Sequence, residues 1–586
     1  MRRRSIGRIT QGLSLRVWHA ELLVVAALAV LAFLVRWPYL QILPHFTDEI
    51  HEILTALHVA RGEAFPLTAQ EAYLGPFHYY ILGALFKVIG PKLVLPRLLV
   101  LVFGVLTVGA TYLLGRSLAG RHVGALGAAL LATSPQHTLI NSHIAWQNAT
   151  MPLYSTLCFA AFIAALNTLR PVSGVEPTAS PAVARRFGPF LALAGCCFGL
   201  TLQTHPGAII LVPPLALAYL IAILAGRRWR LLRSPWLVLA IAAGLLAYSP
   251  VLIFNMMNRF DGLLRATAQR PYAYDLQPTW ESYRTNFREF ALQFARMISD
   301  PTRIPATFGD YLTSPYLVIA VVLALVGFLI LARRGQPLPL LVAVSAQLIL
   351  PRFLKAYGMD DDYPMIAARY VAYLLPLGYL AIATTVVIPA RQFGRIVLRR
   401  YGRPILTNVT SMLWWFVLAV SIAGFVLYPL VPLHRYYEAV MPHDPNNVAA
   451  FALYHELAAY TGDTPIVVDS TLDKIATKEG VTARDVAVFL LQFRGIPYAL
   501  TTNMRETITT STAGVDPANS AALPLVIMER DTCWPLRERF PFERQGERLR
   551  LQNFYRGLPT YFALYRLTPA DPGAGCFGPE GPRAGD

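Results

Sequence analysis

Long apolar runs separated by short clusters of arginine restrict the fold of this chain more than any other feature. The runs include residues 22–34, 98–114, 236–248, 316–332 and 370–388. A helix that crosses a bilayer needs roughly 20 mostly apolar residues. Only 15% of the residues are charged, whereas soluble proteins carry about 25%. The sequence therefore predicts a mainly α-helical, polytopic membrane protein.

The net charge of +17 does not indicate a nucleic-acid-binding protein. The arginines lie in short clusters between apolar runs, and this is the pattern of cytoplasmic loops in membrane proteins. A nucleic-acid groove would interleave basic and aromatic side chains instead. We therefore expect a multi-pass protein of the cell membrane with its arginine-rich N-terminus in the cytoplasm.

The arginine clusters also help to decide which apolar runs cross the membrane. The run Phe77–Gly90 covers about 14 residues, or roughly 21 Å, and is too short for a ~30 Å hydrocarbon core. We interpret it as an amphipathic helix in the membrane interface. Every arginine cluster then falls on the cytoplasmic side. About eleven spans are expected on this reading, at residues 18–38, 93–115, 120–135, 151–169, 188–204, 207–225, 235–257, 315–332, 337–351, 366–389 and 412–431.

Two domains are expected. Residues 1–431 form the membrane domain, and residues 432–586, with their mixed charge, form a small extracytoplasmic α/β domain. Its expected elements are a helix over 447–460 and strands over 465–469, 523–528 and 561–567. Cys533 and Cys576 lie in this tail and can pair if it is exported, but the sequence does not fix their distance.

Acidic residues directly after the first span are the most informative polar feature. Asp48 and Glu49 follow Thr47 at the expected start of a helix over 50–60, and Glu71 precedes a Tyr-Leu-Gly-Pro turn. Carboxylates beside a membrane cost desolvation energy unless they are used or paired. The alternative is a solvated loop whose acids cap the helix.

The first two-thirds of the chain, about residues 1–390, resembles the GT-C superfamily of glycosyltransferases. The branch that it resembles includes protein O-mannosyltransferases and aminoarabinose transferases. The resemblance rests on short motifs in a fixed order. They are Asp48-Glu49, Gly75-Pro76-Phe77-His78, Arg97, Gly115-Arg116, Thr204-His205-Pro206-Gly207, Arg369-Tyr370 and Leu374-Leu375-Pro376.

The resemblance implies inverting transfer of a hexosyl or pentosyl group from a polyprenyl-phosphate donor to an acceptor hydroxyl at the outer membrane face. In that chemistry a carboxylate removes the proton of the acceptor, and the matching position is Asp48. Glu49 would orient Asp48 or the acceptor. The implied partners are the lipid-linked donor, membrane lipid, and a glycan, lipid or protein acceptor.

Release of the lipid phosphate requires cations and hydrogen-bond donors. The candidate substrate-binding residues on the outer side are Glu71, His78, His205, Arg352, Lys355, Tyr357 and Arg369. Arginine suits bidentate contact with phosphate, although interfacial snorkelling explains such residues equally well. Relatives carry lysine at the position of His205, so phosphate contact there would depend on pH; a structural histidine is the alternative.

No cofactor is expected, and a divalent metal is not favoured. The second outer loop, around Ser142–Asn148, lacks the acidic residue that some GT-C enzymes use for metal binding. The run Asp360-Asp361-Asp362 is more typical of a solvated loop than of a metal site.

Two other classes of function remain open. A lipid or solute transporter would place polar residues near the membrane midplane, often with internal repeats, and neither feature is visible. A non-catalytic receptor or assembly subunit would use its tail for binding. The sequence does not identify the sugar, the acceptor or the length of the carrier.

Overall fold

The fold is described from a computed structural model of the chain. It describes residues 3–38, 40, 47–169, 181–260, 279–299, 315–353, 371–401, 419–431, 433–434, 457, 465–470, 483–502, 525–529, 537–539, 551–552, 559–560 and 562–567. The chain divides into two compact units. Unit 1 comprises residues 1–40, 65–81 and 94–436, and unit 2 comprises residues 41–64, 82–93 and 437–586.

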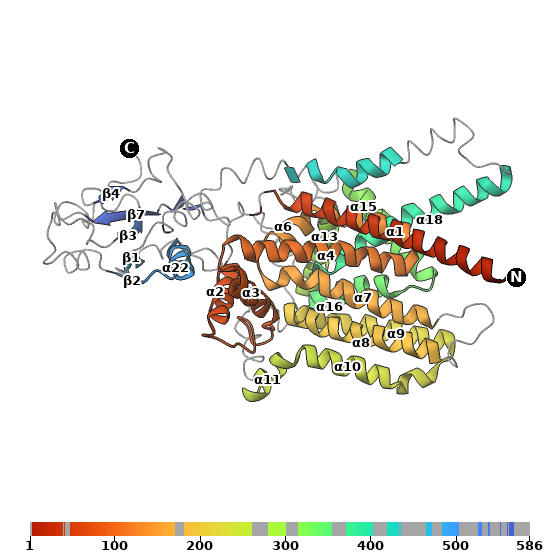
Figure 1. Ribbon diagram of the computed structural model, residues 1–586, viewed down its shortest axis with the longest axis horizontal. Helices are drawn as coiled ribbons and strands as arrows, with labels where there is room; N and C mark the ends of the chain where they lie inside the picture. Colours follow the sequence, from red (N-terminus) through yellow and green to blue (C-terminus); the bar gives the residue numbers. More distant parts are fainter. Residues whose placement is uncertain are drawn as a thin grey trace. The chain divides into compact units, whose positions relative to one another are not determined.

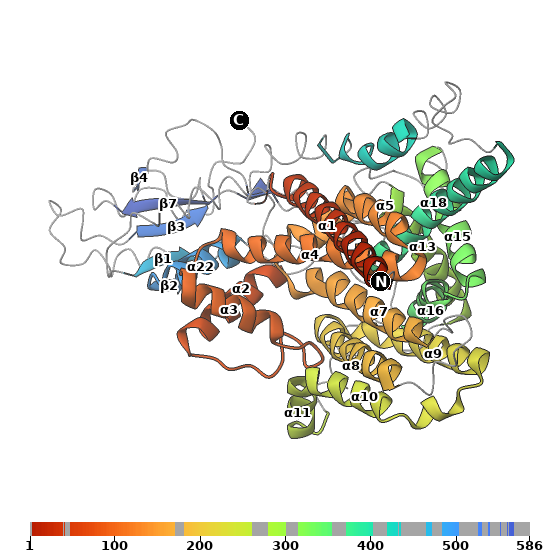
Figure 2. The same ribbon diagram turned by 45° about the vertical axis from the view of Figure 1, so that its right-hand side comes forward.

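Unit 1 is a bundle of helices that run side by side (Figures 1 and 2). Its long members are α1 (Arg3–Arg36), α4 (Val94–Ala119), α7 (Met151–Thr168), α8 (Pro181–Thr204), α9 (Val212–Gly226), α10 (Pro235–Ala247), α13 (Trp280–Ser299), α15 (Pro315–Arg333), α16 (Leu338–Phe353) and α18 (Leu374–Tyr401). Helix α8 packs against α7 and α10, α4 against α5 (Arg121–Ala132) and α7, and α15 against α18.

Hydroxyl side chains inside these apolar helices bond to their own backbone. Thr107, Ser155 and Thr384 each donate to the carbonyl oxygen four residues earlier, at 2.7–2.8 Å. This bond satisfies a polar group that would otherwise be costly to bury. Proline opens several of the helices, including α7, α9 and α10, where its missing N–H costs nothing.

Six described helices are long and apolar enough to cross a membrane, and a seventh candidate is the pair α10 and α11 (Ser249–Met257), which is bent by 65°. The six are His19–Arg36, Val94–Ala119, Gln147–Thr168, Phe187–Thr204, Pro206–Gly226 and Leu374–Phe393. They coincide with spans expected from the sequence. The protein is therefore a multi-pass membrane protein, with six or seven candidate spans in its described part.

The other expected spans are shorter or only partly described. Helix α5 has 12 residues, about 18 Å at 1.5 Å per residue. It ends because Ser134 caps a new helix, α6 (Pro135–Ser142), with proline in its first turn. Residues 318–333 and 338–352 are apolar helices below span length, as is α3 (Phe77–Ile89). The expected span 412–431 lies partly outside the described residues.

Unit 2 contains a five-stranded mixed sheet of order β2-β1-β3-β7-β4. The central strand β1 (Ile466–Asp469) runs parallel to β2 (Tyr498–Thr501) and β3 (Leu525–Glu529). Strand β7 (Phe562–Leu567) runs antiparallel to β3 and β4 (Arg537–Arg539). A separate pair is formed by β5 (Leu551–Gln552) and β6 (Pro559–Thr560). The three strands expected from the sequence are confirmed as β1, β3 and β7.

Helix α22 (Ala483–Arg494) connects β1 to β2 and covers β1 with an apolar face that includes Phe489 and Phe493. The same unit contains α2 (Thr47–Arg61), which packs against α22. The helix that follows the first span therefore shares a compact unit with the C-terminal sheet. The domain boundary that we expect between residues 431 and 432 would make the tail a separate segment. This boundary and the extracytoplasmic location of the tail stay predictions. The expected helix over 447–460 and the Cys533–Cys576 pair lie outside the described residues, apart from Leu457.

Candidate functional site

Helix α2 carries the acidic pair singled out in the sequence. It begins at Thr47, so the helix expected over 50–60 is confirmed and both acids lie in its first turn. The side chain of Asp48 lies outside the described part of the structure. Glu49 is fully buried, and Glu52, one turn later, is buried with 5% of its surface exposed. Glu52 was missed in the sequence, although its i, i+3 spacing from Glu49 places both carboxylates on one helix face.

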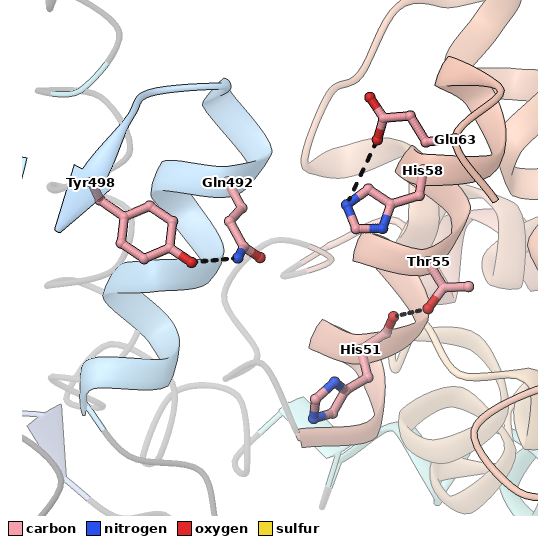
Figure 3. Close-up of polar contacts among 6 residues, drawn as sticks. All are labelled: His51, Thr55, His58, Glu63, Gln492 and Tyr498. Atoms are coloured by element: carbon pink, nitrogen blue, oxygen red, sulfur yellow. Dashed lines mark hydrogen bonds and ion pairs between the residues drawn. The ribbon is translucent and has the colours of Figure 1, made fainter. Parts of the chain in front are cut away.

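A neighbouring face of α2 is polar (Figure 3), and its two histidines are exposed. His51 and His58 lie on it, two turns apart, and Thr55 between them donates to the carbonyl oxygen of His51 at 2.8 Å. His58 Nε2 lies 4.0 Å from Glu63 Oε2 just beyond the helix. In the same unit, Gln492 Nε2 of α22 donates to the hydroxyl of Tyr498 at 2.7 Å. The acids Glu49 and Glu52 therefore belong to the packed face of an amphipathic helix.

In unit 1, the turn that contains the Tyr-Leu-Gly-Pro-Phe motif is hydrogen-bonded to the ends of α8 and α10. Gly75 N donates to the carbonyl oxygen of Gln203 at 2.8 Å, and Phe77 N donates to Gln203 Oε1 at 3.2 Å. The hydroxyl of Tyr248 donates to the carbonyl oxygen of Tyr73 at 2.9 Å. These bonds bring Glu71 and His78, which flank the turn, onto the corner that contains His205.

The geometry of His205 fixes the state of its ring. Its Nδ1 accepts a hydrogen bond from Gly207 N at 3.0 Å and thereby caps the short helix η3 (Pro206–Leu211). A ring nitrogen that accepts a hydrogen bond carries no proton, so His205 is neutral here with its hydrogen on Nε2. In this state the ring brings no positive charge to the corner.

His78 is likewise uncharged near neutral pH. It lies at the second position of α3 and is 5% exposed. Burial lowers its pKa from 6.5 to about 4, because desolvation disfavours the imidazolium. Of the candidate phosphate ligands that the structure describes, only Arg352 carries a charge. It is exposed near the end of α16, a helix that packs against η3. Lys355, Tyr357, Arg369 and Asp360–Asp362 lie outside the described residues.

A second group of polar residues, missed as a site in the sequence, fills the space between the ends of α1, α4 and α5. Arg36 is fully buried there. Its Nε donates to Ser142 Oγ at 2.9 Å, its Nη1 to the carbonyl oxygens of Ala32 and Ala132, and its Nη2 to that of Leu131 and to His137 Nδ1. Arg97, 1% exposed, donates to the carbonyl oxygen of Leu40 at 3.1 Å. The sequence does carry a signal for this group, because residues 133–150 contain no Asp, Glu, Lys or Arg.

The helix ends that carry these unit 1 residues are joined to one another by the hydrogen bonds given above. The alternation of the helices brings the C-terminal ends of α1, α5 and α8 to one end of the bundle, together with the N-terminal ends of α4 and α7 (Figure 1). Within the part of the chain that the structure describes, no cluster of three or more His, Cys, Asp or Glu side chains is arranged to hold a metal ion.

The helical bundle and the small mixed-sheet unit share the fold of ArnT, which is itself a GT-C membrane glycosyltransferase, the class that the sequence motifs predicted. The chain is similar to ArnT from Cupriavidus metallidurans, an aminoarabinose transferase. With ArnT bound to undecaprenyl phosphate, the TM-score is 0.52 at 14% identity, over 95% of this chain and 99% of ArnT. With apo ArnT, the TM-score is 0.52 at 13% identity, over 97% and 100%.

A weaker likeness links the chain to the oligosaccharyltransferase of Archaeoglobus fulgidus in its apo form. The TM-score is 0.45 at 14% identity, over 87% of this chain and 69% of that one. No protein-family model matches the sequence, and no curated protein does.

Proposed function

We propose that this chain is a membrane glycosyltransferase that moves a sugar from a polyprenyl-phosphate donor to an acceptor hydroxyl at the outer face of the membrane. The observation that carries the proposal is the full-length likeness to ArnT, which was solved with undecaprenyl phosphate. The likeness extends over the C-terminal sheet unit as well as the helices. A shared architecture of this extent favours a shared class of donor.

In this proposal Asp48 is the general base. The acceptor hydroxyl loses its proton to the carboxylate while its oxygen attacks the anomeric carbon, and the bond from that carbon to the phosphate oxygen breaks with inversion. Such a base contributes about 10²–10⁴-fold to the rate. The position of Asp48 in the first turn of α2 supports the role, since backbone amides at a helix start stabilise carboxylates. Glu49, buried beside it in the sequence, is its positioning residue.

The leaving group is the polyprenyl phosphate. We assign its binding to the cationic residues Arg352, Lys355 and Arg369, with His205 Nε2–H and Tyr357 as neutral donors. Glu71 and His78 flank the turn that Gln203 fastens to the His205 corner, and in this proposal they line the substrate side of that corner. The N-terminus is cytoplasmic and the sheet unit extracytoplasmic, in keeping with the placement of the arginine clusters.

Purified protein in proteoliposomes tests the proposal. The probes are polyprenyl phosphates that carry one radiolabelled hexose or pentose, presented with extracts of cell-envelope glycans, lipids and proteins as acceptors. We expect release of unglycosylated polyprenyl phosphate and label in a covalent product. Movement of labelled lipid across the bilayer without any covalent product would instead identify a transporter.

A further inference from the structure

Helix α6 is buried along its whole length, although five of its eight residues are polar. It packs against α1, α4 and α5 at the end of the bundle that holds the candidate site (Figure 1). All eight residues from Pro135 to Ser142 are buried. The helix contains no Asp, Glu, Lys or Arg, and its one titratable side chain is His137. With this histidine neutral, the helix offers uncharged hydrogen-bonding groups only.

Arg36 holds α6 in place with the hydrogen-bond donors of its guanidinium group. A guanidinium has five N–H donors and no acceptor. Ser142 Oγ takes the Nε donor, the carbonyl oxygens of Ala32 and Ala132 take those of Nη1, and the Leu131 carbonyl oxygen and His137 Nδ1 take those of Nη2. All five donors are used by the protein. Arg36 is therefore a positioning residue and has no donor left for a phosphate.

The contact with Arg36 also sets the tautomer of His137. Its Nδ1 lies 2.7 Å from Arg36 Nη2, and because a guanidinium can only donate, Nδ1 accepts. The ring is therefore neutral and carries its hydrogen on Nε2. Burial and the Arg36 charge both lower the pKa of His137 well below 6.5, in agreement with a neutral ring. His137 Nε2 is buried and has no hydrogen-bond partner among the described residues.

Asn141 lies one turn further along the same face of α6. It is 1% exposed, and both its Nδ2 and its Oδ1 have no partner within the described part of the chain. The same holds for Thr138 Oγ1 on this helix. A buried polar group without a partner costs about 1–3 kcal/mol, and buried polar groups in proteins are almost always paired with protein, water or ligand.

We propose that His137 and Asn141 form a recognition row for the hydroxyl groups of the sugar that the donor lipid carries. This inference rests on the proposed function. His137 Nε2–H supplies a donor, and the Asn141 amide supplies a donor and an acceptor, a combination that matches neighbouring sugar hydroxyls. A phosphate would need charged donors, and α6 has none. The row therefore binds the sugar, and other residues bind the lipid phosphate.

Asn141→Leu tests the row, because leucine has nearly the same size and removes both amide atoms. The protein is reconstituted in nanodiscs, and its affinity is measured for undecaprenyl phosphate and for the same lipid carrying a hexose or a pentose. We expect about a tenfold loss of affinity for the glycosylated lipid that the unaltered protein prefers, equal to ~1.4 kcal/mol. Affinity for undecaprenyl phosphate itself stays unchanged. Asn141→Ala gives the same pattern if leucine does not fit.

Thermal unfolding separates recognition from a structural role. Removing a buried amide without protein partners leaves the midpoint unchanged or raises it, so we expect Asn141→Leu to unfold no earlier than the unaltered protein. The control is Asn167→Leu, because Asn167 donates to the Ser117 carbonyl oxygen at 2.7 Å and accepts from Gln336 at 3.1 Å. That variant lowers the midpoint and leaves the preference for glycosylated lipid intact.

Three results would overturn the proposal. Equal loss of affinity for both lipids would place Asn141 at the phosphate, and unchanged affinities would show that ordered water satisfies the row. A marked fall in the unfolding midpoint of both Asn141 variants would assign the amide to the protein's own hydrogen bonding. Failure of the proposed function looks different, because the unaltered protein would then bind neither lipid.

Discussion

Gly75 shows how a single residue can place a candidate site. Its backbone N–H bonds to Gln203, and a Cβ at this position would overlap the side chain of Gln203. Only glycine lets the two segments approach so closely. The same glutamine accepts from Phe77 N and donates to the Ala247 carbonyl oxygen, so three segments meet at one side chain.

We therefore expect Gly75→Ala to displace the Gln203 side chain and to reduce the free energy of unfolding by about 1–3 kcal/mol. Thermal unfolding in detergent measures this loss. Gly62→Ala is unsuitable as a control because Gly62 has a φ of +75°. Gly109→Ala is suitable, because a Cβ there meets no atom within 4 Å. Equal stability of the Gly75 and Gly109 variants would contradict the role of Gly75.

His78 predicts a pH dependence. Its pKa is lowered from 6.5 to about 4 by burial, so the folded protein takes up its proton less readily than the unfolded chain. Below pH 6.5 the unfolded chain binds the proton first, and stability is lost as the pH falls towards 4. The loss is about 1.4 kcal/mol per pH unit within this window. Unfolding midpoints of His78→Gln between pH 7 and 4.5 should fall less steeply than those of the unaltered protein; identical slopes would contradict the assignment.

At the scale of elements, small residues allow close contact between helices. Gly195 and Gly199 of α8 face Ala240 and Gly244 of α10, and Gly327 of α15 faces the Ala381 carbonyl oxygen of α18. Membrane helices lack a hydrophobic driving force towards one another and depend on such backbone approach. The bundle is therefore sensitive to added volume at these glycines.

Gly195→Ala should lower the free energy of unfolding by about 1–3 kcal/mol, because the new methyl group would overlap the Ala240 carbonyl oxygen. Gly327→Ala should do the same at the α15–α18 contact. Gly109→Ala in α4 should be neutral or stabilising by about 0.5–1 kcal/mol, since alanine favours helix over glycine. Similar midpoints for all three variants would argue against glycine-mediated packing.

The success of prediction from sequence differed between elements. Strands β1, β3 and β7 were predicted because their apolar runs are rich in β-branched and aromatic residues. Strand β2, with four residues and an exposed middle, carries too little pattern to be found. Helix α6 was missed because neutral polar residues between two apolar runs are typical of a loop. Its burial depends on Arg36, about a hundred residues earlier in the chain, and no local pattern shows such a contact.

The candidate site was predicted only in part. The ordered motifs identified the turn at Gly75 and the corner at His205, which the structure joins through Gln203. The role of Asp48, the sides of the membrane and the contacts of Lys355, Tyr357 and Arg369 stay predictions. Glu52 and His137 were missed because their burial comes from tertiary packing, whereas a sequence pattern reports only the face of a helix on which they lie.

At the scale of the whole molecule, α2 and the C-terminal sheet belong to one compact unit. Helix α2 packs against α22, and Phe86 of α3 contacts Phe493 of α22 with ring centroids 5.9 Å apart. The segment that carries Asp48 and Glu49 is therefore stabilised by residues more than 400 positions away. In the proposed function, this arrangement gives the tail a direct means to influence the catalytic pair.

Phe493→Ala should therefore loosen α2. Truncation of a buried phenylalanine costs about 3–5 kcal/mol, and Phe493 is 3% exposed. Hydrogen exchange followed by mass spectrometry should show faster exchange in the peptide that covers residues 47–61, with no change in α8. Unchanged protection of that peptide would show that Phe493 of the tail does not stabilise α2.

The central claim is that Asp48 removes the acceptor proton in glycosyl transfer from a polyprenyl phosphate. The most direct measurement is the rate at which proteoliposomes release undecaprenyl phosphate from its glycosylated form, compared between the unaltered protein, Asp48→Asn and the exposed control Glu63→Gln. We predict a rate about 10²–10⁴-fold lower for Asp48→Asn, with an unchanged unfolding midpoint, and a normal rate for Glu63→Gln. Full turnover by a folded Asp48→Asn protein would contradict the claim.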